Sequence, residues 1–237
     1  MALSDKKIIL ITSGNRGVGY ETAKNLVLHS PEYHVILGSR NVTKGEKAAQ
    51  EIRTIHGIKG MVSSTQIDVT NDQSVDDAAT RITSEYGRLD VLVNNAGIVS
   101  MESPPTRVVL RRILETNVVG ALSVTEAFLD LLLQARGAGS ITHASNPDSP
   151  YYNPGATEYR TSKAAVNMLM AMYFARLKPE GFLVFGADPG LCATDFTGDA
   201  ESLRQKNAAE PWEGGEHIAT VVKGEKDSDV GKVLGVY

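Results

Sequence analysis

The fold of this chain is decided by one stretch near its N-terminus, Ile8-Ile9-Leu10-Ile11-Thr12-Ser13-Gly14-Asn15-Arg16-Gly17-Val18-Gly19. The apolar run at its start has the length of a buried strand, and a helical pattern follows the last glycine. Glycines let a backbone approach a phosphate closely, and a helix N-terminus offers unpaired N–H groups and a positive dipole end. The spacing differs from Gly-x-Gly-x-x-Gly, so the position between strand and helix is what indicates a dinucleotide site.

Short apolar runs alternate with amphipathic stretches along the rest of the chain. The apolar runs are 7–11, 34–38, 61–67, 91–93, 140–143, 182–185 and 233–236, and the amphipathic stretches are 18–29, 43–56, 74–86, 106–135 and 157–177. Strands that are apolar on both faces and separated by helices indicate a parallel sheet covered on both sides. The sequence therefore predicts an α/β fold, a single doubly wound Rossmann-type domain over residues 1–237 with a seven-stranded parallel sheet.

One polar segment, residues 194–211, interrupts this alternation between the sixth and seventh runs and lacks a clean apolar strand. We interpret it as a mobile substrate lid with a short helix. An ordinary surface excursion is the alternative.

The bulk composition excludes several classes of protein. The chain has 237 residues, 42% of them hydrophobic, and a net charge of −4, so no basic excess points to a nucleic-acid partner. Cys192 is the only cysteine, which rules out an intrachain disulfide and fits a reducing compartment. The N-terminal apolar run is too short for a signal peptide or a membrane span, and His143 has no metal-ligand partner at suitable spacing. We expect a cytoplasmic protein without membrane contact or metal site.

The end of the second apolar run bears on which nicotinamide cofactor is bound. NAD-binding proteins carry an acid about 20 residues beyond the glycine loop, where it bonds the adenosine ribose. This chain has Gly38-Ser39-Arg40 there and no acid. A guanidinium suits the oxygens of a 2′-phosphate, and Arg16 in the loop could reach the same group. We predict NADP(H) rather than NAD(H); in the alternative interpretation both arginines are solvated surface residues.

Two further strand ends are candidates for cofactor contact. Asp68, just after the third run and before Val69, is placed to bond the adenine edge, although an N-cap is the other explanation for it. The fourth run closes with small residues and amides, Asn94-Asn95-Ala96-Gly97, which leave room for a cofactor and offer donors to it.

The stretch Tyr159-Arg160-Thr161-Ser162-Lys163 carries the chemistry. Tyrosine and lysine at i and i+4 project from one face of a helix, and a cation beside a phenol favours the phenolate. That effect lowers a pKa of about 10 toward neutrality, where the group can exchange protons. With the glycine loop and the strand-end Ser145, the pair points to hydride-transfer chemistry on a nicotinamide cofactor.

Over residues 6–237 the chain resembles the short-chain dehydrogenase/reductase superfamily, in its compact single-domain branch. The loop at 12–19 looks like that family's Thr-Gly-x-x-x-Gly-x-Gly, and 94–97 is its Asn-Asn-Ala-Gly. The other matching motifs, in family order, are the helix asparagine Asn117, the strand-end Ser145, the pair Tyr159 and Lys163, and Pro-Gly-x-x-x-Thr at 189–194. Ser13 departs from the pattern, because a glycine usually stands there; if the position needs φ > 0, Ser13 costs roughly 1–3 kcal/mol of local strain.

The resemblance implies a role for each matching residue. Tyr159 is the general acid in reduction, Lys163 stabilises the tyrosinate and bonds the nicotinamide ribose, and Ser145 donates to the substrate oxygen. Asn117 would hold a proton-relay water, and Thr194 would contact the carboxamide. The expected cofactor-binding residues are Ser13, Gly14, Asn15, Arg16, Gly17, Val18, Gly19, Ser39, Arg40, Asp68, Val69, Asn95, Ala96, Gly97, Tyr159, Lys163, Pro189, Gly190 and Thr194.

Substrate and assembly follow less directly. Tyr151, Tyr152 and Phe196 would give the pocket aromatic walls, which favours an apolar or aromatic ketone, aldehyde or quinone. The helix at 157–177 carries apolar residues such as Met168 and Met172 on more than one face, as a helix at an interface does. By resemblance, two such helices from each subunit pack together, so we expect a homodimer or homotetramer.

Three functions compete at this point. The first is an NADP(H)-dependent carbonyl reductase or alcohol dehydrogenase acting on a small-molecule carbonyl or alcohol. The second is a catalytically silent NADP(H)-binding regulator or redox sensor, which would have no need of Ser145, Tyr159 and Lys163 together. The third is a dehydratase or epimerase, but those relatives carry a larger substrate domain than this chain has length for.

Overall fold

Seven strands form one sheet in the order β3-β2-β1-β4-β5-β6-β7, and every neighbouring pair is parallel. The computed structural model describes residues 5–100, 104, 106–135, 140–144 and 157–235. The strands are β1 (Lys7–Ile11), β2 (Tyr33–Ser39), β3 (Met61–Gln66), β4 (Val91–Asn94), β5 (Ser140–Ala144), β6 (Leu183–Asp188) and β7 (Val233–Gly235). The seven-stranded Rossmann-type sheet predicted from the apolar runs is confirmed. Strand order reverses between β1 and β4, and open α/β sheets bind ligands beyond the carboxyl ends of such a pair.

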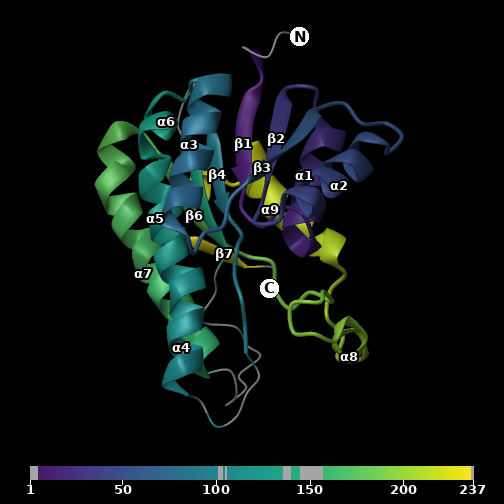
Figure 1. Cartoon of the computed structure of the whole chain (residues 1–237), viewed down its shortest axis with the longest axis vertical. Helices are drawn as coiled ribbons and strands as arrows, with labels where there is room; N and C mark the ends of the chain where they lie inside the picture. Colours follow the sequence, from purple (N-terminus) through teal and green to yellow (C-terminus); the bar gives the residue numbers. More distant parts are fainter. Residues whose placement is uncertain (1–4, 101–103, 105, 136–139, 145–156, 236–237) are drawn as a thin grey trace.

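Helices cover both faces of this sheet (Figure 1). On one face lie α1 (Gly17–His29), α2 (Val42–Arg53) and α9 (Pro211–Lys223). On the other lie α3 (Asp72–Tyr86), α4 (Arg107–Leu114), α5 (Gly120–Ala127), α6 (Leu129–Leu133) and α7 (Thr157–Leu177). Successive strand residues feed opposite cores: Ile8 and Leu10 pack toward the α3–α7 side, whereas Ile9 and Ile11 pack toward α1 and α9. This alternation is the period of two that a strand buried on both faces requires.

The stretch 106–135, expected as one amphipathic helix, is broken into pieces. A π-helical segment, η2 (Glu115–Val119), separates α4 from α5, and Phe128 interrupts the helix again before α6. π-Helical turns within α-helices are frequent at functional sites. This one contains Asn117, a predicted site residue.

Helix α9 was not predicted, because Gly214 and Gly215 stand in its first half and glycine is a poor helix former. The structure shows why both are needed. A Cβ on Gly215 would lie 2.6 Å from Glu21 Cβ on α1, and one on Gly214 would lie 2.5 Å from Cys192 Sγ. The two glycines therefore let α9 pack closely against α1 and against the turn after β6.

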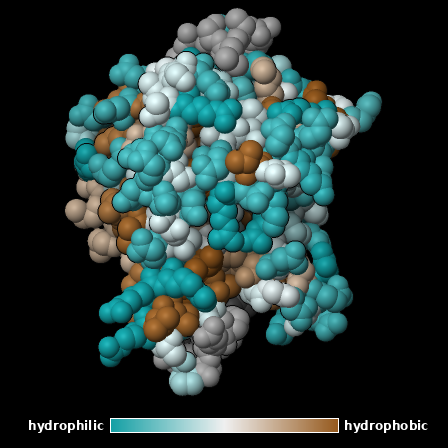
Figure 2. All heavy atoms as spheres, in the orientation of Figure 1, coloured by the Kyte–Doolittle hydropathy of each residue, from teal (hydrophilic) through white to brown (hydrophobic). Residues whose placement is uncertain are grey.

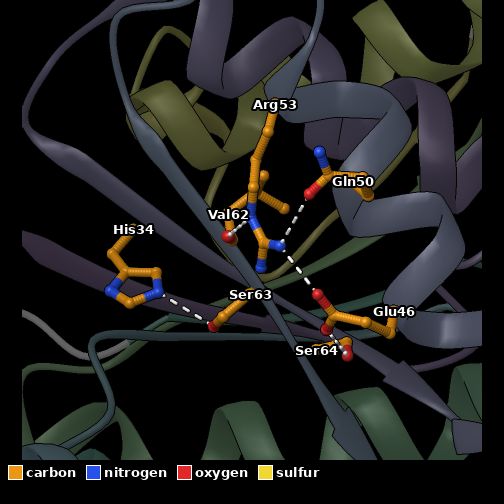
Figure 3. A network of polar contacts seen from close by, with 7 residues as sticks. All are labelled: His34, Glu46, Gln50, Arg53, Val62, Ser63 and Ser64. Carbon is orange, nitrogen blue, oxygen red and sulfur yellow. Dashed lines mark hydrogen bonds and ion pairs between the residues drawn. The ribbon is translucent and has the colours of Figure 1, made fainter.

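Polar contacts fasten α2 to the edge strand β3 (Figure 3). Arg53 Nη1 donates to Glu46 Oε1 at 2.7 Å and Arg53 Nε donates to the Val62 carbonyl at 3.1 Å. The hydrogen bond from Arg53 is the main reason that the Glu46 pKa is lowered. The ion pair with Glu46 is exposed, lies within α2 and is individually weak. The bond to the Val62 carbonyl is partly buried and covers part of a strand edge that would otherwise present unpaired groups.

His34 lies in the same view and is buried without a full set of partners. Its Nε2 is 2.9 Å from Ser63 Oγ, its ring meets Tyr86 edge-on at 5.2 Å, and its Nδ1 has no hydrogen-bond partner among the residues that the structure describes. Burial, followed by the charge of Lys6, lowers its pKa from 6.5 to about 4. The native protein thus holds His34 neutral over a pH range in which the unfolded chain protonates it.

Stability should therefore fall as pH falls from about 6.5 to about 4, because the unfolded state binds more protons in that window. His34 accounts for up to about 3 kcal/mol of the unfolding free energy across the range. Denaturant titrations at several pH values measure this, with His34→Phe as the comparison because it keeps an aromatic edge against Tyr86 without titrating. The variant should lose that much less stability on acidification; parallel curves for the two proteins would refute the assignment.

Candidate functional site

The loop between β1 and α1 contains a serine, Ser13, whose backbone is strained. Ser13 has φ 52°, so the positive φ considered from the sequence is present, at a cost of roughly 1–3 kcal/mol for a residue other than glycine. Asn95 Nδ2 donates to the carbonyls of Thr12 and Ser13 at 2.9 and 3.2 Å, which holds the strained turn in place. Gly14 N donates to the Gly38 carbonyl at 3.0 Å.

Thr12 joins the ends of β1 and β4, and sequence reasoning gave it no role. Its Oγ1 accepts from Asn95 N at 3.0 Å and from Ala96 N at 2.9 Å. A Cβ on Gly19 would fall 2.4 Å from Asn95 Nδ2, so glycine is required there for the two loops to meet. The predicted site residues of the first and fourth strand ends are thus brought together at the point where strand order reverses.

The N-terminus of α1 fits a diphosphate. Helix α1 begins at Gly17 after Arg16, which makes no side-chain capping bond, and its first turn has no acidic residue. The unpaired N–H groups in the first turn of this 13-residue helix therefore point out of its N-terminus, at the positive end of its dipole. Gly17 has φ 58°, and a Cβ there would lie 3.6 Å from Thr194 Cγ2, so Thr194 borders the same loop. Asn15 and Val18 lie within this loop and first turn and are partly exposed.

Arg16 and Arg40 are both exposed, and neither forms an ion pair among the residues that the structure describes. Ser39 is buried at the end of β2, where its Oγ donates to the Asn41 carbonyl at 2.8 Å. The hydroxyl of Ser39 thus bonds within the turn before α2. A phosphate bound here would contact the guanidinium groups of Arg16 and Arg40 instead.

Asp68 closes its own turn. Its Oδ1 accepts from Thr70 N at 3.0 Å and from Thr70 Oγ1 at 2.8 Å, and Asn71, not Asp68, is the N-cap of α3. Asp68 thus caps a turn, as the alternative interpretation of this residue predicted, while the helix itself has its own cap. Val69 packs on the first residue of α5, since a Cβ on Gly120 would lie 2.9 Å from Val69 Cγ2.

Asn117 connects the loop after β4 to α7. Its Oδ1 accepts from Ile98 N at 2.8 Å, while its Nδ2 donates to the Ile98 carbonyl at 3.0 Å and to Ser162 Oγ at 2.9 Å. Ser162 Oγ in turn donates to the Tyr159 carbonyl at 2.7 Å. The side-chain amide of Asn117 is bonded to protein groups. The water-holding role expected of Asn117 would therefore have to use another group of this residue. The amide instead fixes the backbone beneath Tyr159, through a serine that sequence reasoning overlooked.

Tyr159 and Lys163 share one face of α7 as predicted. Both side chains are half-buried, with Lys163 Nζ 5.4 Å from the centre of the Tyr159 ring. Phe196 meets the same ring edge-on at 5.9 Å, so the aromatic wall expected from Phe196 lies against the tyrosine. Ser145, Tyr151 and Tyr152, the other residues expected here, lie outside the described residues.

The expected lowering of the Tyr159 pKa was wrong in direction. Burial, together with the negative charge of Asp188, raises the Tyr159 pKa above its usual 10. Burial also lowers the Lys163 pKa to about 8, with Asp188 opposing the fall. The i, i+4 spacing indicates the cation near the phenol, but it does not show the partial burial of both groups, which favours their neutral forms. Tyr159 therefore keeps its proton at neutral pH, in the form that a general acid needs.

The turn after β6 is held by its own backbone. Gly190 has φ 72° and follows Pro189, and Thr194 N donates to the Cys192 carbonyl at 2.8 Å.

Beyond this turn, the segment proposed as a lid contains the expected short helix, α8 (Ala200–Gln205). A two-pronged ion pair joins Arg204 to Glu210, with Nε–Oε1 at 2.8 Å and Nη2–Oε2 at 3.2 Å.

The described part of the chain also bears on metal sites and on membrane-spanning helices. No group of three or more His, Cys, Asp or Glu side chains is arranged there to hold a metal ion. None of the helices described is long and apolar enough to cross a membrane.

Comparisons with known proteins agree with this geometry. The model of the short chain dehydrogenase family matches residues 7–205. A protein from Talaromyces stipitatus called short-chain dehydrogenase/reductase tropE is 34% identical, covering 99% of this chain and 97% of its own. Short-chain dehydrogenase/reductase eupG from a Phoma species is 32% identical, covering 94% of this chain and 92% of its own.

Solved structures resemble the fold throughout. A short-chain type dehydrogenase/reductase from Mycobacterium marinum superposes with a TM-score of 0.85 at 25% identity, covering 99% of this chain and 96% of that one. A 3-oxoacyl-[acyl-carrier protein] reductase from Brucella melitensis, crystallised with NAD, has a TM-score of 0.85 at 23% identity, covering 97% and 95%.

Proposed function

This chain belongs to the short-chain dehydrogenase family, and from that premise we propose that it is an NADP(H)-dependent oxidoreductase that interconverts a carbonyl compound and an alcohol. One observation carries the proposal. Lys163 Nζ lies 5.4 Å from the centre of the Tyr159 ring, and the backbone of that tyrosine is fixed by Ser162 and Asn117.

The preference for NADP(H) is supported by charge at the adenosine end. An exposed Arg40 follows β2 where an NAD-binding protein has an acid, and Arg16 stands at the start of α1. The outward N–H groups of α1 would receive the diphosphate, and Thr194 borders the same loop. The Brucella melitensis reductase of similar fold was crystallised with NAD, so the cofactor preference rests on this chain's own arginines.

In the proposed mechanism the bound dinucleotide supplies or accepts hydride, and the protein supplies position and protons. Tyr159 Oη gives its proton to the carbonyl oxygen in reduction and takes it back in oxidation. The Lys163 ammonium stabilises the tyrosinate formed in that step. Ser145, by resemblance, donates a hydrogen bond to the same oxygen as negative charge develops on it.

The proposed substrates are apolar or aromatic ketones, aldehydes or quinones. The support is Phe196, which is 40% exposed and whose ring lies edge-on to Tyr159, so an apolar group bound beside the acid would contact it. We place residues 194–211 over this site as a substrate lid, within a single domain spanning the chain.

Loss of NADPH absorbance tests the function against a panel of aromatic and aliphatic ketones, aldehydes and quinones. Turnover is expected with at least one aromatic carbonyl compound. Tight NADPH binding without turnover across the panel would contradict the proposal and favour the silent regulator.

We also propose that the protein is a homodimer or homotetramer assembled through the α4–α7 layer. Exposed apolar residues gather on this layer, and Figure 2 shows apolar side chains between charged ones around α4. Val108 on α4 is 71% exposed, and Met168 and Met172 on α7 are 64% and 62% exposed. Exposed apolar patches of this kind mark interfaces more often than free surface.

Light scattering should therefore give at least twice the chain mass of 25.4 kDa at micromolar concentration. Met172→Glu should shift the protein toward monomer, because a charge would have to be buried in the interface. Val42→Glu is the matched control, since Val42 is 64% exposed on α2, away from this layer. A monomeric wild type would contradict the assembly.

A further inference from the structure

Asp188, the last residue of β6, lies beside the Tyr159–Lys163 pair, and neither the family motif nor the proposed mechanism gives it a role. Strand parity decides which face it occupies. Phe185 and Ala187 belong to the core on the α1 and α9 side, whereas Val184 belongs to the core on the α7 side. Asp188 is four residues from Val184, so its side chain is on the α7 face of the sheet.

The direction of α7 places its first turns above Asp188. Helix α7 ends at Leu177, and the chain reverses through η3 (Lys178–Glu180) before entering β6. The helix therefore runs antiparallel to β6, with Tyr159 and Lys163 near the carboxyl edge where Asp188 stands. The Asp188 carboxylate is oriented by its own turn, because Oδ1 accepts from Gly190 N at 3.1 Å and Gly190 has φ 72°.

The electrostatics agree with this placement. Among the residues that the structure describes, Asp188 acts on the pKa of both Tyr159 and Lys163, and it raises both. It also acts on Cys192 in the following turn, where Glu213 of α9 contributes a second negative charge. In the described part of the chain, the titratable groups coupled to Asp188 are Tyr159 and Lys163 on α7 and Cys192 in the turn, and Glu213 on α9 acts on Cys192.

We propose that Asp188 is a positioning residue for the reaction, whose carboxylate serves as the counter-charge that keeps the Lys163 ammonium and the Tyr159 proton in place. The inference rests on the proposed function of the same site. Burial lowers the Lys163 pKa and Asp188 opposes that fall, so without this charge a smaller share of Lys163 would be the ammonium that stabilises a tyrosinate. The carboxylate also disfavours the tyrosinate directly, which biases Tyr159 toward proton donation.

The substitution Asp188→Asn tests the proposal, because it removes the charge and keeps an oxygen to accept from Gly190 N. The pH profiles of kcat for carbonyl reduction and alcohol oxidation should both move to lower pH by about one unit. Glu213→Gln is the matched control, since it removes the same charge from a carboxylate that acts on Cys192 but on neither Tyr159 nor Lys163. Its profiles should superpose on those of the wild type.

A second readout does not depend on turnover. In protein labelled with carbon-13 at the lysine ε-carbon, NMR titration follows Lys163, assigned by the signal missing from Lys163→Arg. Its pKa should drop in Asp188→Asn and stay unchanged in Glu213→Gln. Unmoved profiles or an unmoved lysine titration in Asp188→Asn would overturn the proposal. An inactive wild type that still shows the NMR shift would contradict the oxidoreductase function while supporting the role of Asp188.

Discussion

Tyr159→Phe should lower kcat by roughly 10²–10⁴-fold while leaving the Kd for NADPH within a factor of about two. The variant lacks only the hydroxyl that carries the transferred proton, and the phenyl ring keeps its contacts with Phe196 and Lys163. Single-turnover rates with saturating NADPH measure the chemical step, and fluorescence titration measures the binding.

The matched control for this substitution lies on the same helix. Tyr173 is buried on α7, and its hydroxyl donates to Glu126 Oε1 at 2.6 Å, away from the proposed site. Tyr173→Phe should cost about 1 kcal/mol of stability and leave kcat within a factor of about two. A Tyr159→Phe variant with wild-type rates would show that the proton comes from elsewhere.

Arg40→Gln should raise the Kd for NADPH by about 10–100-fold and leave the Kd for NADH nearly unchanged. A hydrogen bond to a charged group contributes about 1.5–3 kcal/mol, and each 1.4 kcal/mol is a factor of ten in affinity. Only NADPH carries the 2′-phosphate, so the loss should be confined to it. Arg16→Gln should act in the same direction, because its guanidinium is also exposed beside the loop.

Arg107→Gln controls for the loss of one positive charge, since Arg107 is exposed at the start of α4 rather than beside the glycine loop. It should leave both dissociation constants unchanged. A wild type that prefers NADH, or an Arg40→Gln variant that weakens both cofactors equally, would refute the assignment to the 2′-phosphate.

The sequence predicted the sheet well because its signal is local. The inner strands β1, β2 and β4 are short apolar runs, and a run buried on both faces needs no knowledge of its neighbours to be recognised. The positive φ at Ser13 was considered for the same reason, since a turn between strand and helix constrains its own backbone.

Features that depend on tertiary contacts were missed. Gly214 and Gly215 read as helix breakers, yet they are required where α9 meets Cys192 and α1. The hydrogen bonds that Thr12 accepts from the loop after β4, and that Asn117 donates to Ser162, join residues far apart in the chain. No spacing rule in the sequence reveals such pairs. The local signal for the second pair is Ser162 itself, a small polar residue just before Lys163.

The predicted direction of the Tyr159 pKa shift was wrong for a related reason. The spacing of Tyr159 and Lys163 indicates the attraction between them, whereas the cost of burying both depends on the whole fold. The negative charge of Asp188 belongs to another element and is likewise invisible in the helix pattern.

The most direct measurement is the fate of deuterium from NADPH that carries deuterium in both hydrogen positions of the hydride-donating carbon of nicotinamide, followed by mass spectrometry of the product of an aromatic ketone. The account predicts an alcohol with one deuterium on its carbinol carbon, formed by the wild type and nearly absent with Tyr159→Phe. An alcohol free of deuterium, or equal labelled product from both proteins, would contradict it.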